Sequence, residues 1–394
     1  MTDYWADGLG APADVRGKWG QIAWKIGEEI AGPNADDVDR NARFPSETVA
    51  ALRENGLLSA LLPKDCGGDD ASLAEISSAI RGLAFHCASS ALVLAMHSLE
   101  TFNLKRHGTT PGLKALAKDI GTNNLLVANG YSEVGFGGDI ARSFCALETG
   151  KNPMTLEKQA LAISYGEYAD IVTTTSRRSP EASESDQIVM FLRPPHLQLE
   201  PTSNWDSIGL RGTCSRGFRI TAEVSPELLF PVPHATLLID GGAQSRQLLL
   251  NSVWIGLAEA AAARAHSFVR EAARRTVGTT PPTALRLSEL AVELQEGRSV
   301  LVSAALRFGE LDKVGDVQNA GYIFAMRSLK VSTSTLAVRT ATRALAIIGI
   351  AGYRRDSPFS LDRIIRDSHG GVIMGSNERN LQDNAQMLLA RKQI

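Results

Sequence analysis

The sequence predicts an α+β fold in three consecutive parts: an N-terminal helical domain, a middle β domain and a C-terminal four-helix bundle. Three observations predict it. Residues 15–127 show helical periodicity with helix-start signals, residues 128–240 hold short β-branched runs between polar or proline-rich breaks, and long helical periodicity returns from residue 244. The expected domains are therefore residues 1–127, 128–240 and 241–394.

The first domain is marked by helix-start and helix-stop residues. Pro45 precedes one short periodic run and Gly56 ends it. Pro63 and the pair Gly67–Gly68 then force a loop. The segment Ser72–Glu75 has the spacing of a capping box, so it should open a long helix rich in Ala, Leu and Ser.

The middle domain shows the pattern of short strands. Residues 171–175 and 187–191 are β-branched or apolar runs, and they are separated by Ser179–Pro180. A further strand is expected around residues 218–220, directly after a turn that contains Arg211. We expect Arg211 to hold this scaffold together as an ion-pair donor, because its planar guanidinium suits several partners at once.

The last part contains four long periodic segments, which a helical bundle accommodates with few connections. Pro281–Pro282, Gly315 and the stretch 349–360 separate them. The expected helical segments are residues 244–275, 284–309, 315–347 and 372–391.

Composition excludes several function classes. Lys plus Arg number 41 against 43 for Asp plus Glu, so there is no basic excess of the kind that binds nucleic acid. The four cysteines are far apart, without CxxC spacing, which indicates neither a zinc site nor a disulfide framework. The start lacks a basic segment followed by an apolar run, and no segment reaches the roughly 20 apolar residues of a membrane span. We therefore expect a cytoplasmic protein with no metal and no membrane partner.

Three motifs at the end of the chain carry a family resemblance. They are Gly349–Tyr353, Arg366–Asp367 and Ile373–Asn377, and their order and spacing resemble the end of the acyl-CoA dehydrogenase family, which reads GGxGY, RD and Glu-Gly-Thr. In that family the Glu removes the α-proton of an acyl thioester while a flavin takes the β-hydride. Counted without a gap, the position of that Glu is Gly375, and with one deletion it is Met374. Neither residue can accept a proton.

The family also has a second location for the base, on the first bundle helix. In this sequence that position holds Arg246, which stays protonated and is therefore no base. It could bind an acyl carbonyl or a carboxylate of the substrate, or simply lie in solvent at the start of a helix. Two other groups near the tail motifs are candidates for the proton transfer. Glu378 would equally serve the first turn of a helix that begins at Asn377, and His369 would equally be a solvated residue in a loop flanked by glycines.

The segment Ser132–Asp139 resembles the family's Thr-Glu-Pro-x-x-Gly-Ser-Asp, whose hydroxyls contact flavin and pyrophosphate. The resemblance implies that Tyr131 and Ser132 face the flavin ring, and that Gly137 and Gly138 bring backbone N–H groups close to a phosphate. Read alone, the glycines indicate no more than a tight turn. Gly138 lacks the hydroxyl of the family's second contact residue.

The segment Lys158–Asp170 resembles the family's Lys-x-Trp-Ile-Thr-Asn-x-x-x-Ala-Asp. Ser164 takes the position of the Thr that contacts flavin N5, and Ala162 takes the position of the stacking aromatic residue. An ordinary strand with one exposed face would give the same pattern.

The resemblance also implies contacts to the adenine and pyrophosphate half of FAD, some of them from a neighbouring subunit. Arg274 and Arg275 fall where the family has Arg-x-x-Phe-Gly, although a positive helix end explains them equally well. Gly349 and Asn377, from the tail motifs, complete the expected cofactor contacts.

Over nearly the whole chain the resemblance thus implies an FAD-dependent oxidoreductase that acts on an acyl thioester of CoA or a carrier protein. Fold does not fix chemistry, and the missing Glu leaves three hypotheses open. They are a dehydrogenase with a relocated or absent base, a flavin monooxygenase or oxidase, and a catalytically silent subunit of a hetero-oligomer. A homodimer or homotetramer is expected, or an assembly with a paralogous subunit.

Overall fold

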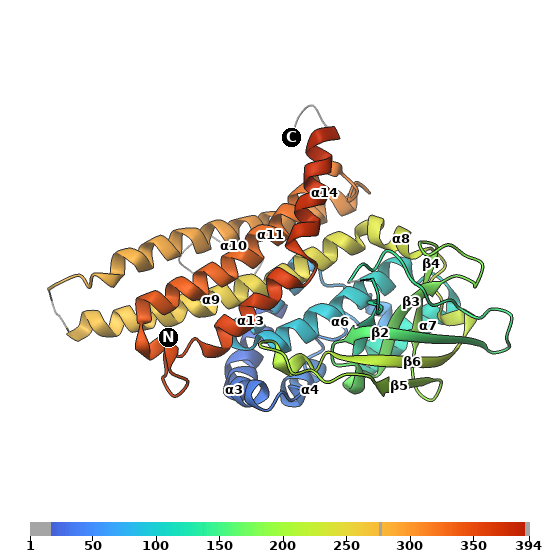
Figure 1. Ribbon diagram of the computed structural model, residues 1–394, viewed down its shortest axis with the longest axis horizontal. Coiled ribbons are helices and arrows are strands. Elements are labelled where there is room, and N and C mark those ends of the chain that lie inside the picture. Colours follow the sequence, from blue (N-terminus) through green and yellow to red (C-terminus); the bar gives the residue numbers. More distant parts are fainter. Residues whose placement is uncertain (1–16, 137, 276–277, 391–394) are drawn as a thin grey trace.

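A computed structural model describes residues 17–136, 138–275 and 278–390 of the 394-residue chain. Figure 1 shows helices at the N-terminal end of the sequence beneath a bundle of long helices, with the strands gathered at one end of the molecule. This is the α+β arrangement that the sequence predicts. No helix of the described residues is long and apolar enough to cross a membrane.

The N-terminal helices enclose the first part of the core. The first of them passes through a single π-helical stretch, Gly27–Ala31, without breaking. Helix α5 begins with the expected capping box, in which the Ser72 hydroxyl accepts from the Glu75 N–H and the Glu75 carboxylate accepts from the Ser72 N–H. The helices are α2 (Lys18–Ile26), α3 (Gly32–Arg40), α4 (Ser46–Glu54), α5 (Leu73–His86), α6 (Ala88–His107) and α7 (Pro111–Asn123).

Two three-stranded sheets form the middle part. In the first, β1 is parallel to β3 and β3 is antiparallel to β4; in the second, β6 lies between β2 and β5 in antiparallel pairing. Strands β3 and β4 are buried along nearly their whole length, whereas β2 alternates between buried and exposed residues. The first sheet is therefore covered on both faces, and the second faces solvent on one. The strands are β1 (Val127–Gly130), β2 (Met154–Ile163), β3 (Ile171–Arg177), β4 (Gln187–Leu192), β5 (Leu197–Pro201) and β6 (Arg216–Val224).

Helix α9 is the centre of the molecule. Its residues 251–262 are all buried, and it contacts α5 and α6 of the N-terminal part as well as α10, α11 and α13 of the bundle. Its first turns lie beside the strands, and its last turns lie at the opposite end of the bundle (Figure 1). The C-terminal helices are α8 (His234–Leu237), α9 (Ala243–Arg275), α10 (Thr283–Lys313), α11 (Ala320–Ile348), α12 (Ile350–Tyr353), α13 (Asp362–Ile373) and α14 (Asn377–Ala390).

The end of the chain differs from the expectation at one place. Residues 362–373 form helix α13, so the prediction that His369 lies in a glycine-flanked loop is wrong. Gly370 and Gly371 are compatible with this helix because they lie against neighbours that leave no room for side chains. A Cβ at Gly370 would come within 2.5 Å of the Leu210 side chain, and a Cβ at Gly371 within 2.9 Å of Trp254. Close contact outweighs the low helix propensity of glycine here.

Candidate active site

A buried carboxyl group joins helix α6 to strand β1. The Glu100 side chain is fully buried, and it accepts hydrogen bonds from Asn129 Nδ2 at 2.6 Å and from the Tyr131 hydroxyl at 2.8 Å. Burial raises the pKa of Glu100, and the hydrogen bonds from Asn129 and Tyr131 only partly offset this. Glu100, Asn129 and Tyr131 are called the Glu100 cluster below. They place the Tyr131 side chain in the protein interior.

Arg246 lies next to the Glu100 cluster, in the first turns of α9. It is half-buried, and burial lowers its pKa although the nearby Tyr131 and Glu100 side chains act in the opposite direction. It makes no hydrogen bond and no ion pair within 4 Å with any residue in the described ranges. A half-buried guanidinium with unused donors is therefore available to a bound group.

His234, in α8, completes the surroundings of Tyr131, whose ring meets the imidazole edge-on at a centroid distance of 5.2 Å. Burial lowers the pKa of His234 to about 3, and the charges of Arg246 and Lys158 contribute. Neither ring nitrogen finds a hydrogen-bond partner among the described residues. His234 is thus a neutral polar group at neutral pH.

The position of the missing Glu lies in the turn between α13 and α14. Gly375 there has φ +66°, and an added Cβ would have one neighbour within 4 Å, Lys330 Cε at 3.8 Å. Lys330 extends from α11, and its ammonium donates to Asn377 Oδ1 at 2.5 Å and to the Val372 carbonyl at 3.4 Å. Burial lowers the pKa of Lys330 to about 8, and it makes no ion pair with any described carboxylate. A buried amine, and no acid, borders this position.

The two other candidates for proton transfer lie on exposed helix surfaces. Glu378 is in the first turn of α14, which begins at Asn377 as expected, and His369 is on the exposed side of α13. Neither makes a hydrogen bond or ion pair with a described residue. Glu378 suits the helix N-terminus, where a negative charge is favourable.

The glycine-rich loop after β1 is held by a buried acid. The Glu133 carboxylate accepts from the Ser143 hydroxyl at 2.7 Å and from the Cys145 N–H at 2.9 Å. The Ser132 hydroxyl spans to β2, donating to the Ala162 carbonyl and accepting from its N–H. Gly138 has φ +80° with open space around it, and Gly137 lies outside the described residues. The loop is therefore anchored at both ends and open at Gly138.

Ser164 stands at the end of a chain of hydroxyl groups. Its Oγ lies 2.8 Å from Ser215 Oγ, which lies 2.8 Å from Thr213 Oγ1, and Thr213 donates to the Leu210 carbonyl. Since each hydroxyl has one proton, the Thr213 bond fixes the direction: Ser215 donates to Thr213 and Ser164 donates to Ser215. The proton of the half-buried Ser164 hydroxyl is therefore already used, and only its lone pairs remain. Toward a cofactor, Ser164 can accept a hydrogen bond.

The groups expected at the adenine end of FAD lie elsewhere. Arg274 is 28 residues beyond Arg246 on α9, which is about 42 Å along a helix. Arg275 pairs with Glu271 on the exposed surface of the same helix. Gly349 has φ +69° with open space around it, and Ile350 beside it is 73% exposed. Within one chain, Arg274 therefore lies far from Arg246 and the Glu100 cluster beside it.

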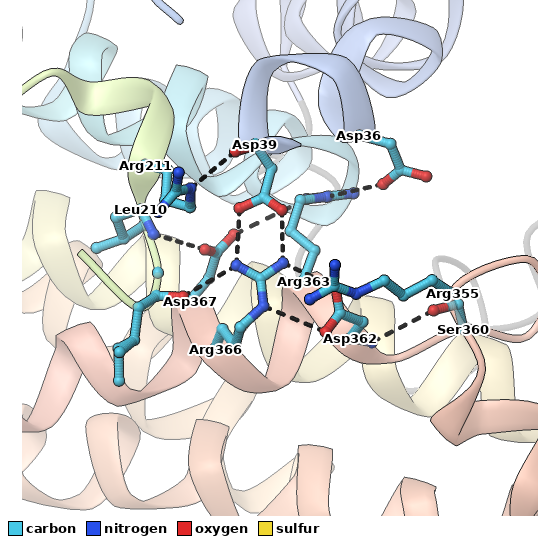
Figure 2. Close-up of polar contacts among 12 residues, drawn as sticks. Asp36, Asp39, Leu210, Arg211, Arg355, Ser360, Asp362, Arg363, Arg366 and Asp367 are labelled. Carbon is cyan, nitrogen blue, oxygen red and sulfur yellow. Dashed lines mark hydrogen bonds and ion pairs between the residues drawn. The ribbon is translucent and has the colours of Figure 1, made fainter. Parts of the chain in front are cut away.

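The Arg366–Asp367 motif clamps three parts of the fold together (Figure 2). The Arg366 guanidinium holds both carboxylate oxygens of Asp39 in α3, at 2.9 and 2.5 Å, and also binds Asp362. Asp367 accepts from the Leu210 N–H at 2.6 Å, and Arg211 donates to the Asp39 carbonyl at 2.9 Å. Arg211 is the scaffold donor that the sequence predicts. We call these residues the Arg366 clamp.

Sequence reasoning missed Glu100, His234 and Lys330. Glu100 carries a visible signal, because it is an acid within the largely apolar run 88–104. Lys330 and His234 carry none, since their importance comes from neighbours distant in sequence.

Comparison with known proteins identifies sequence relatives over most of the chain. The profile described as "Acyl-CoA dehydrogenase, C-terminal domain" matches residues 243–389, and "Acyl-CoA dehydrogenase, N-terminal domain" matches residues 24–114. A probable acyl-CoA dehydrogenase, fadE25, of Mycobacterium leprae is 24% identical over 357 residues, 87% of each chain. The 3-sulfinopropanoyl-CoA desulfinase of Paraburkholderia xenovorans is 22% identical over 389 residues, covering 96% of this chain and 97% of that protein.

Solved structures agree on the fold. Butyryl-CoA dehydrogenase from Megasphaera elsdenii superimposes with a TM-score of 0.82 at 20% identity, over 96% of this chain and 99% of that one. FMN-bound TdsC from Paenibacillus sp. A11-2 gives a TM-score of 0.84 at 18% identity, over 95% and 97% of the two chains.

Proposed function

The chain belongs to the acyl-CoA dehydrogenase family, and from this premise we propose that it acts on an acyl thioester whose acyl part carries an anionic group, without a carboxylate base at either family position. It is an acyl-CoA dehydrogenase-like flavin oxidoreductase. The proposal rests on the position and environment of Arg246. This half-buried arginine occupies one base position and has unused donors.

Two features of the site support an anionic substrate group. A carboxylate or sulfinate presents paired oxygens, which a guanidinium binds with two parallel hydrogen bonds. The Glu100 cluster beside Arg246 does not neutralise it through a direct ion pair, and burial favours the uncharged form of Glu100. Binding an anion there would also give the half-buried guanidinium the partner that it lacks in the described structure.

One relative supports the same substrate class. The 3-sulfinopropanoyl-CoA named for the Paraburkholderia xenovorans desulfinase is an acyl-CoA with an anionic sulfinate on its acyl chain. That protein aligns with nearly the whole of this chain, including the segment around Arg246.

We propose FAD as the cofactor, which would supply the redox chemistry of the reaction. The residues present fit a flavin at two points. Ser164 offers half-buried lone pairs, and Gly138 leaves open space beside the anchored loop. Arg274 and Gly349 would hold the adenine half. Because TdsC is an FMN-bound structure on the same fold, absorption spectra with FAD and with FMN distinguish the two cofactors.

The proposed oligomeric state follows from the distance between Arg274 and the other residues expected to bind the cofactor. We propose a homodimer or homotetramer in which Arg274 of one chain and Ser164 of another serve one FAD. The exposed Ile350 and Tyr353, each 73% exposed beside Gly349, would then be covered. Light scattering should give two or four times the 42.2 kDa of one chain. A 42 kDa particle at micromolar concentration would contradict a homo-oligomer.

The binding test uses two acyl-CoAs of equal acyl length, one of which carries an anionic end group. Butanoyl-CoA and succinyl-CoA both have four acyl carbons, but succinyl-CoA ends in a carboxylate. Titration of each into the flavin-loaded protein, followed by the flavin absorption spectrum, should show succinyl-CoA binding about 10-fold more tightly or better, from a charge-assisted bond of about 1.5–3 kcal/mol. In Arg246→Gln the preference should disappear. The control is Arg270→Gln, an exposed arginine on the same helix. Equal affinities in the unchanged protein would contradict the proposal.

A flavin monooxygenase is the second candidate function, because its chemistry does not require the Glu that Gly375 replaces. Its test is consumption of O₂ by the reduced flavoprotein with formation of an oxygenated product. A silent subunit, the third hypothesis, would retain no flavin of its own.

A further inference from the structure

A polar cavity of about 180 Å³ lies apart from the candidate active site, beside the Arg366 clamp. It is enclosed by α3, by the middle of α9 and by the segment that leads into α13. Figure 2 shows Asp36, Arg355, Ser360, Asp362 and Arg363, which are among its lining residues. The charged lining residues are Asp36, Asp39, Asp362, Arg40, Arg264, Arg355 and Arg363.

The three acids of this cavity are all paired with arginines. Asp36 pairs with Arg363 at 3.3 Å, and Asp362 pairs with Arg355 at 3.2 Å. Asp39 is held by Arg366 of the clamp. The negative charges of the lining are therefore already balanced.

Two of the arginines have no such partner. Arg264 and Arg40 make no hydrogen bond or ion pair within 4 Å with any residue that the structure describes. Arg264 is half-buried, and burial together with the like charge of Arg363 lowers its pKa to about 10. Arg264 therefore lines the cavity with guanidinium donors that no acceptor of the described residues uses.

The neutral lining residues add further donors. The Ser357 hydroxyl accepts from the Phe359 N–H, and the Ser360 hydroxyl accepts from the Asp362 N–H. Neither hydroxyl proton is given to another described residue, so each is available to a ligand. The unused groups of the cavity are thus two guanidiniums and two hydroxyls, all of them donors.

We infer that this cavity is a binding site for a phosphate group, with Arg264 as its central contact. A phosphate offers several acceptor oxygens with negative charge, which guanidinium groups bind in pairs. The cavity volume is many times the 10–15 Å³ or so that one water needs, so a phosphate with part of its ester fits. Arg264 is 18 residues from Arg246, about 27 Å along α9, and the site is therefore distinct from the acyl site.

Inorganic phosphate is the probe, titrated into the full chain by calorimetry at constant ionic strength maintained with NaCl. We expect saturable binding, and a rise in melting temperature with phosphate that NaCl does not reproduce. Arg264→Gln should weaken binding at least tenfold, while Arg270→Gln, on the exposed side of the same helix, should not. Absence of saturable binding, or equal binding by Arg264→Gln, would overturn the inference.

A second readout separates a binding role from a structural one. Without phosphate, Arg264→Gln should melt at the same temperature as the unchanged protein or higher, because the change removes an unpartnered charge. If Arg264→Gln does not fold, Arg40→Gln replaces it, since Arg40 is exposed and should cost about 3-fold in phosphate affinity or more. Unchanged affinity in that variant would also overturn the inference. Competition by CoA would identify a phosphate carried by CoA, and its absence a free phosphate.

Discussion

The first half of helix α13 and the turn that follows the helix differ in their charged groups. In its first half, every charged group of the Arg366 clamp has a partner, and Arg366 alone binds Asp39, Asp362 and a carbonyl of the 205–211 loop. At its end, the turn through Gly375 carries no acid, and the nearest side chain to an added Cβ is a lysine. One helix thus keeps the contacts that hold the fold and lacks the group that defines the family's usual reaction.

The difference shows that fold and chemistry depend on separate residues here. The clamp joins the N-terminal helices, the β domain and the bundle, so its loss would affect all three. A change at Gly375 affects only a turn. Family membership therefore predicts the architecture of this chain well and its reaction poorly.

Breaking the clamp should have the largest effect on stability. Arg366→Gln leaves Asp39, whose side chain is 10% exposed, without its bidentate partner. Removing one member of a largely buried ion pair costs on the order of 3–5 kcal/mol. Calorimetry should show a clearly lower melting temperature. Arg354→Gln, whose partner Asp356 is exposed, should melt like the unchanged protein.

The close approach of the 205–211 loop to α13 can be broken by one methyl group. In Gly209→Ala the new Cβ would lie 2.3 Å from the Arg366 carbonyl oxygen, a backbone atom that cannot turn away. We expect a cost of about 1–3 kcal/mol and a lower melting temperature. Gly309→Ala, on the exposed face of α10 with nothing within 4 Å, should instead stabilise by about 0.5–1 kcal/mol. Equal effects of the two changes would contradict this contact.

Asp367 of the Arg366 clamp should make the stability of the protein depend on pH. Burial raises its pKa from 3.8 to about 6, so the folded protein binds a proton more tightly there than the unfolded chain. The preference of the folded state for the protonated Asp367 carboxyl stabilises the protein fully below pH 3.8. This stabilisation is lost as the pH rises through 6. Asp367→Asn cannot ionise and should gain up to about 3 kcal/mol relative to the unchanged protein between pH 4 and 7.5. A constant difference in melting temperature across this range would contradict the assignment.

At the C-terminal end of α13, two substitutions test which position corresponds to the family's catalytic Glu. Gly375→Glu forces a side chain onto φ +66° and should cost about 1–2 kcal/mol, whereas Met374→Glu has an ordinary φ of −62° and should cost less. Dye-reduction assays with butanoyl-CoA should then detect activity in one variant. The more active variant reports the position that corresponds to the family Glu.

Local signals in the sequence predict much of the fold. Ser72 and Glu75 form their capping box, and Asn377 begins α14, because caps depend on residues within one turn. Helix α13 was not predicted, since Gly370 and Gly371 fit it only through their contacts with Leu210 and Trp254. For the same reason the site was predicted only in part. Arg246 could be predicted because it falls at the family's second base position. Lys330 could not, because only the fold brings it beside Gly375, which is 45 residues away in the sequence.

The central claim is that this chain has no carboxylate to remove an α-proton at the family's base positions. Its most direct test is the anaerobic absorption spectrum of the FAD-loaded protein after addition of butanoyl-CoA. Since efficient proton removal requires a positioned group of suitable pKa, the oxidised flavin band should persist. Rapid bleaching that survives Glu378→Gln and His369→Ala would show that another group removes the α-proton, and would contradict the prediction that the loss of the family's base leaves butanoyl-CoA without turnover.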